Sequence, residues 1–405
     1  IVKPEDLASI TEMQSADDAP VISIVNSIIS QAIKERASDI HVEPTDNNLR
    51  VRYRIDGELR EAFSFPIKTH ALLISRLKIM SELDIAEKRL PQDGRINFRE
   101  GDREIDIRVS SLPTVIGEKI VLRILDRASV IVDIKRLGFA EKNLAVYKKL
   151  YSQSYGMILV TGPTGSGKTT TLYSTLTGLN KPTKNIITVE DPTEYRLDGI
   201  NQVQVNAKAG LTFAAGLRSI LRQDPNIIMV GEIRDGETAD IAIRAALTGH
   251  LVLSTLHTND SIGAVSRLVD MGVEPFLVAS SVLGILAQRL VRKICPECKE
   301  SYVLETDSPE RAFFGEHYQD GTTLYRGAGC PSCANTGYRG RMAIHEVFPI
   351  SKGLRELITE KASGEKLKAL AAQEGMTTMQ YDGFQKVLVG ETTINEIMRV
   401  AYAEL

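Results

Sequence analysis

The most specific chemical signature in the sequence is the run GPTGSGKT at residues 162–169. It matches the phosphate-binding pattern GxxxxGK[ST] completely, follows an apolar run at residues 157–161 and precedes a helix-like segment. Glycines let backbone N–H groups point into such a loop and hold phosphate oxygens at the positive end of a helix. The alternative is a chance glycine-rich turn, which this strand–loop–helix context disfavours.

The loop predicts a binding site for ATP and Mg²⁺. Lys168 supplies a positive charge for the phosphates, and the hydroxyl of Thr169 is the expected magnesium ligand. The nucleotide-binding residues that the pattern predicts are Gly162, Pro163, Thr164, Gly165, Ser166, Gly167, Lys168, Thr169 and Thr170.

Two acidic residues that end later apolar runs are candidates for the chemistry of hydrolysis. NIIMVGE has Gly231 where a metal-binding Asp commonly stands, so Glu232 becomes the candidate to orient or deprotonate water. The run ending in VED places Glu190 at another strand end. Because the carboxyl ends of parallel strands converge on one crevice, we expect both carboxylates to face the γ-phosphate and magnesium. The alternative is a pair of solvated carboxylates at strand ends.

His250 and His257 bracket the next apolar run. His257, in STLHTND, stands at a predicted strand C-terminus and is the better candidate for a γ-phosphate sensor. The alternative is a polar side chain that is held by packing.

All four cysteines fall in two pairs with two intervening residues, Cys295 with Cys298 and Cys330 with Cys333. This spacing predicts a closed site with four thiolate ligands for Zn²⁺ and a structural role, although the gap between the pairs exceeds that of common zinc modules. The pairing also favours a reducing compartment. A redox pair or free thiols are the alternative.

The elements that must position these residues divide a chain of 405 residues into two or three domains. Short apolar runs that alternate with helical segments after residue 157 predict a parallel sheet covered on both faces, hence an α/β fold. The expected regions are a linker (1–19), an α+β domain (20–126), a hinge (127–140), the ATPase core (141–294), a four-cysteine module (295–341) and a mainly helical C-terminal region (342–405).

Within the first domain, helical spacing predicts a helix from Pro20 and another near residues 69–83. Period-two alternation with turns at Asp56-Gly57 and Gly101 predicts two hairpins, followed by a strand at residues 119–125.

Residues 275–291 form the most apolar helix candidate. It carries Gln288 and Arg289, and we interpret it as a buried helix and not a membrane span. The start at Ile1 is typical of a fragment without its natural N-terminus.

Composition bears on a rival function, a nucleic-acid motor. The net charge is −3, Trp is absent and aromatic residues make up 5%, so stacking platforms for bases are scarce and no nucleic-acid partner is expected. The arginines of the first hairpin are then expected to form a solvated face. Another rival, a nucleotide-binding scaffold without turnover, is disfavoured by Glu190 and Glu232.

Four blocks of sequence resemble the secretion ATPases, also called traffic ATPases. They are the phosphate-binding loop, an "Asp box" (ITVEDPTEY), an atypical Walker B segment (RQDPNIIMVGEIRD) and a "His box" (ALTGHLVLSTLHTND). The upstream runs ASDIHVEP and RLPQDGRI are also similar to the N-terminal domain of that family, so the resemblance covers nearly the whole chain. Gly231 is then a family trait and not a defect.

The resemblance implies a PAS-like N-terminal domain, a RecA-like P-loop ATPase domain and a homohexameric ring. It implies that Glu190 and Glu232 act on magnesium and the attacking water, and that the four cysteines bind metal. By position, Arg108 and Arg123 resemble the arginine fingers of the family. Three further arginines resemble those that the family places near the subunit boundary: Arg218, Arg222 and Arg234.

The residues themselves give modest support to Arg123, which interrupts an otherwise apolar strand. A guanidinium there needs an anion, because an unpaired buried charge is costly. A polyphosphate at the domain boundary would serve, and an internal ion pair with Asp106 or Glu104 is the alternative.

Within the family, RLPQDGRI, GLRSILRQDP, GVEPFLVASS and AQRLVRKICPECK are closer to the type II secretion branch. Pilus-extension enzymes share the cysteines and the catalytic boxes and remain an alternative, whereas the pilus-retraction branch lacks the cysteines. The resemblance implies a cytoplasmic protein at the inner membrane, which works with a secretion platform and the cytoplasmic domain of an anchor protein.

Overall fold

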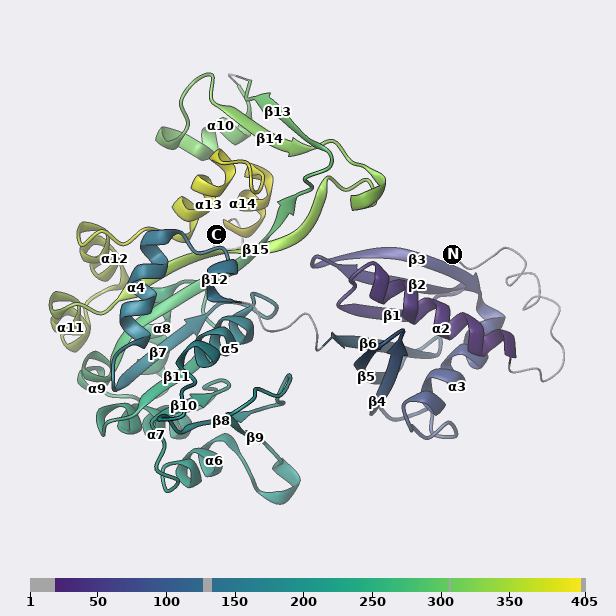
Figure 1. Ribbon diagram of the computed structural model, residues 1–405, viewed down its shortest axis with the longest axis horizontal. Helices are drawn as coiled ribbons and strands as arrows, with labels where there is room; N and C mark the ends of the chain where they lie inside the picture. Colours follow the sequence, from purple (N-terminus) through teal and green to yellow (C-terminus); the bar gives the residue numbers. More distant parts are fainter. Residues whose placement is uncertain (1–18, 127–132, 306, 402–405) are drawn as a thin grey trace. The chain divides into compact units, whose positions relative to one another are not determined.

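The computed structural model describes residues 19–126, 133–305 and 307–401. The chain falls into two compact units, Ile1–Val130 and Ile131–Leu405, and each is described by itself (Figure 1). Most of the predicted linker and the first part of the predicted hinge lie outside the described residues.

Unit 1 is an antiparallel sheet with two helices packed on one face (Figure 1). The helices are α2 (Ala19–Lys34) and α3 (His70–Met80), and the strand order is β3-β2-β1-β6-β5-β4. Both predicted hairpins are present, with Asp56 and Gly57 at positive φ in the first turn. The strands are β1 (Asp39–Pro44), β2 (Asn48–Ile55), β3 (Glu58–Pro66), β4 (Gln92–Glu100), β5 (Arg103–Pro113) and β6 (Glu118–Asp126).

The two faces of this sheet differ in chemistry because side chains alternate along each strand. In β1, Ile40 and Val42 are buried in the core with the two helices. Asp39, His41 and Glu43 therefore lie on the opposite face, which also carries the arginines of β2.

Unit 2 is built on a seven-stranded sheet of order β15-β12-β7-β11-β10-β8-β9, in which only the β12–β15 pair is antiparallel. One face packs against α4 and α5, and the other packs against α6, α7, α8, α9, α11 and α12 (Figure 1). This is the predicted α/β arrangement with a parallel sheet covered on both faces. The strands are β7 (Gly156–Thr161), β8 (Ile186–Glu190), β9 (Asn201–Gln204), β10 (Ile227–Val230), β11 (Leu251–Leu256), β12 (Val282–Ile294) and β15 (Tyr338–Pro349).

The helices of unit 2 connect these strands and follow them at the C-terminus. They are α4 (Glu141–Tyr151), α5 (Lys168–Leu179), α6 (Phe213–Ile220), α7 (Gly236–Leu247), α8 (Ser261–Asp270), α9 (Pro275–Ser281), α11 (Lys352–Thr359), α12 (Gly364–Gln373), α13 (Met379–Leu388) and α14 (Ile394–Ala401). None of the helices in the described ranges is long and apolar enough to cross a membrane.

The prediction of one buried helix over residues 275–291 is wrong. Helix α9 ends at Ser281, and the chain continues as β12, which is buried between β7 and β15. A continuously apolar run has no period that separates a buried helix from a buried strand. In the region from residue 342, predicted to be mainly helical, β15 continues to Pro349 and the helices α11 to α14 follow.

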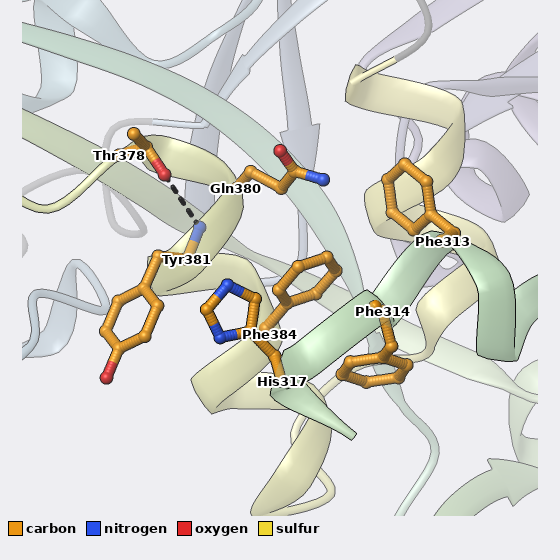
Figure 2. A pocket seen from close by; sticks show the side chains of 8 residues that line it. Phe313, Phe314, His317, Thr378, Gln380, Tyr381 and Phe384 are labelled. Atoms are coloured by element: carbon orange, nitrogen blue, oxygen red, sulfur yellow. Dashed lines mark hydrogen bonds between the residues drawn. The ribbon is translucent and has the colours of Figure 1, made fainter.

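The cysteine-bearing segment leaves the sheet at the end of β12 and returns to it at β15. It contains β13 (Lys299–Val303), α10 (Pro309–Phe314) and β14 (Thr323–Gly327). Figure 2 shows how α10 meets α13, where Phe314 stacks on Phe384 and His317 lies against Tyr381. An open pocket of about 280 Å³ lies at this contact, and none of its lining residues belongs to the predicted sites.

Candidate nucleotide and metal sites

The phosphate-binding loop joins the buried strand β7 to the first turn of α5, as its sequence predicts. Gly162, Gly165 and Gly167 have φ values of 143°, 79° and 88°, which residues with a Cβ rarely adopt. The Lys168 ammonium donates to the carbonyl oxygens of Gly162 and Pro163, at 2.7 and 3.0 Å. These contacts hold the positive charge over the loop.

Two features of the loop fit a bound triphosphate with its Mg²⁺. The hydroxyl of Ser166 is buried and has no hydrogen-bond partner among the described residues, so it is available to a ligand. Burial, together with the nearby charge of Arg289, lowers the pKa of Lys168 to about 8, while Glu232 opposes this shift. Because burial destabilises the charged form of Lys168, a bound anion would stabilise it.

Glu232 lies just beyond β10, two strands away from β7 in the sheet. Arg234 donates to one carboxylate oxygen, and His257 Nε2 lies 3.4 Å from the other. Burial raises the pKa of Glu232, but the hydrogen bond and charge of Arg234 and the contact with His257 outweigh it and lower the pKa. The carboxylate is therefore ionised at neutral pH, as a group that accepts a proton from water must be.

Arg234 also reaches Asp191 across the ends of β8 and β10, at 3.6 Å. The structure thus brings Glu232, His257 and Arg234 together at one edge of the sheet. Arg218 pairs with Glu237, and Arg222 donates to the backbone of Arg218.

Glu190 has a different environment from that expected for a group that contacts magnesium. Its side chain is only 3% exposed and accepts hydrogen bonds from the hydroxyls of Tyr173 and Thr188 and from Gln202 Nε2. Both carboxylate oxygens are occupied by these buried donors. The geometry makes Glu190 an anchor of the β8–β9 edge, and contact with a metal would require this network to rearrange.

Arg108 and Arg123 lie in unit 1 as register partners on β5 and β6, with Arg95 opposite Arg108 on β4. Arg123 is 61% exposed, so the expectation of a buried guanidinium is wrong. Its partner is Asp39 on β1, which accepts from Nε at 3.0 Å, and not Asp106 or Glu104.

The contacts that Arg52 and Arg123 make with carboxylates on this face differ. Glu43 accepts from both Nε and Nη2 of Arg52, at 2.7 and 3.0 Å, which occupies the planar end of that guanidinium. Asp39 takes the Nε of Arg123, the atom nearest the backbone. This contact orients a side chain that is 61% exposed.

The four cysteine sulfurs form one cluster, in which all Sγ atoms lie within 4.8 Å of one another. Cys295 and Cys298 lie 3.8 Å from Cys330 and Cys333, respectively. Four sulfurs at about 2.3 Å from a tetrahedral zinc ion are separated by about 3.8 Å, so the observed spacing fits Zn²⁺.

Backbone N–H groups also point at the sulfurs, as expected around thiolates. Gly329 donates to Cys298, and both Cys330 and Gly337 donate to Cys333, at 3.2–3.3 Å. Burial raises the pKa of Cys298 to about 12 and also raises the pKa of Cys330, whereas at Cys333 the N–H groups of Cys330 and Gly337 outweigh burial and lower the pKa to about 6.

Three residues that contact the sites were not predicted as site residues, although they lie in runs that resemble the family, Asp39 in ASDIHVEP and Gln288 and Arg289 in AQRLVRKICPECK. Gln288 and Arg289 of β12 touch the phosphate-binding loop and the loop after β11, and Asp39 orients Arg123. The first two were predicted to lie in a helix, so their position beside the loop was not expected. A prediction of residues 282–294 as a strand of the sheet would have indicated that Gln288 and Arg289 lie near the loop.

Residues 14–399 match the family model described as Type II/IV secretion system protein. Type II secretion system protein E of Pseudomonas aeruginosa is 53% identical over 97% of this chain and 78% of that protein. Type II secretion system ATPase E of Vibrio cholerae is 52% identical over 96% of this chain and 76% of that protein. The type IV pilus assembly ATPase PilB of Myxococcus xanthus is 52% identical, with coverages of 98% and 71%.

Solved structures are similar over the same length. The pilus retraction motor PilT with bound ADP has a TM-score of 0.61 and 28% identity, and the match covers 93% of this chain and 96% of that chain. The ATPase DotB of Yersinia pseudotuberculosis has a TM-score of 0.70 at 19% identity, with coverages of 96% and 94%, which is a likeness of fold alone.

Proposed function

This chain belongs to the type II/IV secretion system protein family, and we propose that it is the ATP-hydrolysing motor that powers protein export through a type II secretion system. The observation that carries the proposal is the convergence of the phosphate-binding loop, the ionised Glu232 and His257 at one edge of a parallel sheet. Binding alone would not need Glu232, because phosphates are held by the loop.

In this proposal each side chain has a distinct role. The loop and Lys168 hold the β- and γ-phosphates. Thr169 would hold Mg²⁺, and a bound Mg²⁺ would supply positive charge for the phosphate oxygens. Glu232 orients the attacking water and accepts its proton. Arg234 and His257 keep the Glu232 carboxylate ionised and in place. We assign Glu190 to the support of the sheet edge.

Arg108 and Arg123 supply positive charge to the γ-phosphate of a neighbouring subunit in a homohexamer. Their support is the in-register arginine row on one face of the unit 1 sheet and the way Asp39 holds Arg123 by its Nε. An arginine delivered in this way is worth roughly 10³–10⁵ in rate.

The four-cysteine cluster binds one Zn²⁺ as a closed structural site, because four thiolates leave no open position for a substrate. The protein is expected at the cytoplasmic face of the bacterial inner membrane. There it would act on a secretion platform and the cytoplasmic domain of an anchor protein.

The alternative within the family is pilus extension, favoured by the 52% identity to PilB. A strain that lacks the natural gene separates the two when it is complemented with the full gene or with its Lys168→Ala version. Restored release of exoproteins by the parent only is the expected result. Restored surface pili without exoprotein release would reassign the motor to pilus assembly.

A further inference from the structure

Gln288 of β12 lies directly under the phosphate-binding loop. Gln288 is 1% exposed, and its side chain makes two hydrogen bonds, one to the loop and one to the first turn of α5. Nε2 donates to the backbone carbonyl of Ser166 at 2.6 Å, and Oε1 accepts from the hydroxyl of Thr171 at 2.8 Å. A carbonyl oxygen can only accept, so the orientation of the amide is fixed by its partners.

The first and last glycines of the motif also pack against this residue. A Cβ at Gly162 would lie 2.4 Å from the backbone oxygen of Gln288, and one at Gly167 would lie 3.0 Å from its Nε2. Both glycines are therefore needed for close approach to Gln288 as well as for their positive φ. At both glycines the path of the loop is therefore limited by contact with Gln288, through its backbone oxygen at Gly162 and its side chain at Gly167.

The strand that carries Gln288 is rigidly held. Gln288 is paired with His345 of β15, and the preceding Ala287 is paired with Thr161 at the end of β7. The backbone of Gln288 is thus fixed by the sheet independently of the loop, so its amide can support the loop. A loop whose N–H groups must converge on phosphate oxygens gains most from such a fixed support, because no reorganisation is then needed on binding.

From this geometry we propose that Gln288 is a positioning residue for ATP binding, which holds the phosphate-binding loop in its phosphate-binding shape. It acts through Ser166 and Thr171 and does not touch the nucleotide. The inference goes beyond the proposed motor function, which needs only the loop itself.

Gln288→Glu tests the proposal with almost no change in volume. The carboxylate can still accept from Thr171, but it cannot donate to the Ser166 carbonyl and adds negative charge under the phosphates. We expect the Kd for a fluorescent ATP analogue to rise about tenfold or more in a variant whose cooperative unfolding shows that it is folded, although the buried carboxylate lowers its unfolding temperature. Gln373→Glu, at an exposed position at the end of α12, makes the same chemical change and should leave the Kd unchanged.

Thr171 provides a second test that introduces no charge. Thr171→Val removes the donor to Gln288 Oε1 and should weaken nucleotide binding, whereas Thr171→Ser keeps the hydroxyl and should restore the parent Kd. Restoration by serine separates the hydrogen bond from simple packing, which both variants alter.

Three outcomes are distinguishable in these titrations. Weaker binding by Gln288→Glu and Thr171→Val, with Thr171→Ser and Gln373→Glu like the parent, supports the proposal. Parent-like Kd values for folded Gln288→Glu or for Thr171→Val would overturn it. A parent protein that binds no nucleotide would instead contradict the motor function itself.

Discussion

His257 Nε2 lies 3.4 Å from a carboxylate oxygen of Glu232, although the two residues follow different strands of the sheet. Arg234 holds the other oxygen of the same carboxylate, so Glu232 is bracketed by two groups that favour its ionised form. The site therefore separates two tasks. Lys168 and the loop hold phosphate, and Glu232 is left to act on water.

That separation predicts different defects for two substitutions. Lys168→Ala should abolish both ATP binding and hydrolysis, because the positive charge on the phosphates is lost. Glu232→Gln should retain nucleotide affinity and lose about 10²–10⁴-fold in turnover, since the amide cannot accept a proton. Phosphate release and nucleotide titration measure the two effects. Turnover by Glu232→Gln within a few-fold of the parent would contradict the assignment.

Glu190 should affect stability more than chemistry. Glu190→Ala leaves the buried hydroxyls of Tyr173 and Thr188 without an acceptor, at roughly 1–3 kcal/mol each, and removes one of the acceptors of Gln202, so the melting temperature should fall by roughly 5–10 °C. Glu232→Ala, at a more exposed carboxylate, serves as the matched control and should shift it much less. Conversely, a Glu190→Gln protein with the parent melting temperature and no turnover would support a catalytic role for Glu190.

His345 gives unit 2 a pH-dependent stability. Its ring is fully buried and stacks on Phe139 at 3.7 Å between centroids, and neither nitrogen has a hydrogen-bond partner among the described residues. Burial, and then the charge of Lys386, lowers the pKa of His345 well below its ordinary value, while the neighbouring Asp382 is paired with Lys386. The unfolded chain therefore binds a proton below about pH 6.5 that the folded protein does not.

The contribution of His345 to the free energy of unfolding is therefore largest above pH 6.5. Below that pH it falls by about 1.4 kcal/mol per pH unit. Denaturant unfolding between pH 5 and 7.5 measures the slope. His345→Phe keeps the stacked ring without a titrating group, so the slope should decrease by that amount. An unchanged slope in the variant would assign the pH dependence to other groups.

The sulfur cluster predicts about one zinc per chain by elemental analysis. Cys298→Ser or Cys330→Ser should release the metal and loosen the segment between β12 and β15, because metal affinity in such a site is folding free energy. ATP binding should survive, since Gln288 is held by the pairing of β12 with β7 and β15 and not by the cysteines. A fully folded parent protein without metal would refute the assignment.

The arginines of unit 1 predict an activity that depends on assembly. Arg108→Ala and Arg123→Ala should cut turnover sharply in assembled protein with little loss of nucleotide affinity, because they act on charge in the transition state. Arg52→Ala, on the same face but engaged by Glu43, is the control for lost surface charge.

A dilution series extends this test to the ring. Specific activity should fall as light scattering reports dissociation to monomers. A constant rate per subunit through complete dissociation would contradict the ring hypothesis. Parent-like turnover in both Arg108→Ala and Arg123→Ala would contradict their assignment as arginine fingers.

The ion pair between Arg123 and Asp39 could not be predicted from the local sequence of either strand. From the sequence, Arg123 interrupts an apolar strand and needs an anion, and the candidates were a polyphosphate at the domain boundary or, as the alternative, Asp106 or Glu104. The actual partner is 84 positions away, on β1, and is brought alongside by the pairing of β1 with β6. Strand order across a sheet is a non-local property, which local periodicity does not contain.

The sequence by itself determined the loop, its flanking strand and helix, the paired cysteines and both hairpins of unit 1, because each depends on residues close together along the chain. Only the tertiary structure decided that residues 282–294 are a strand and that Gln288 supports the loop. It also decided that Glu190 is buried among donors from three elements while Glu232 is held beside His257. The physical reason is burial. Whether an apolar run becomes helix or strand, and whether a carboxylate meets water or buried donors, depends on neighbours that only the assembled sheet supplies.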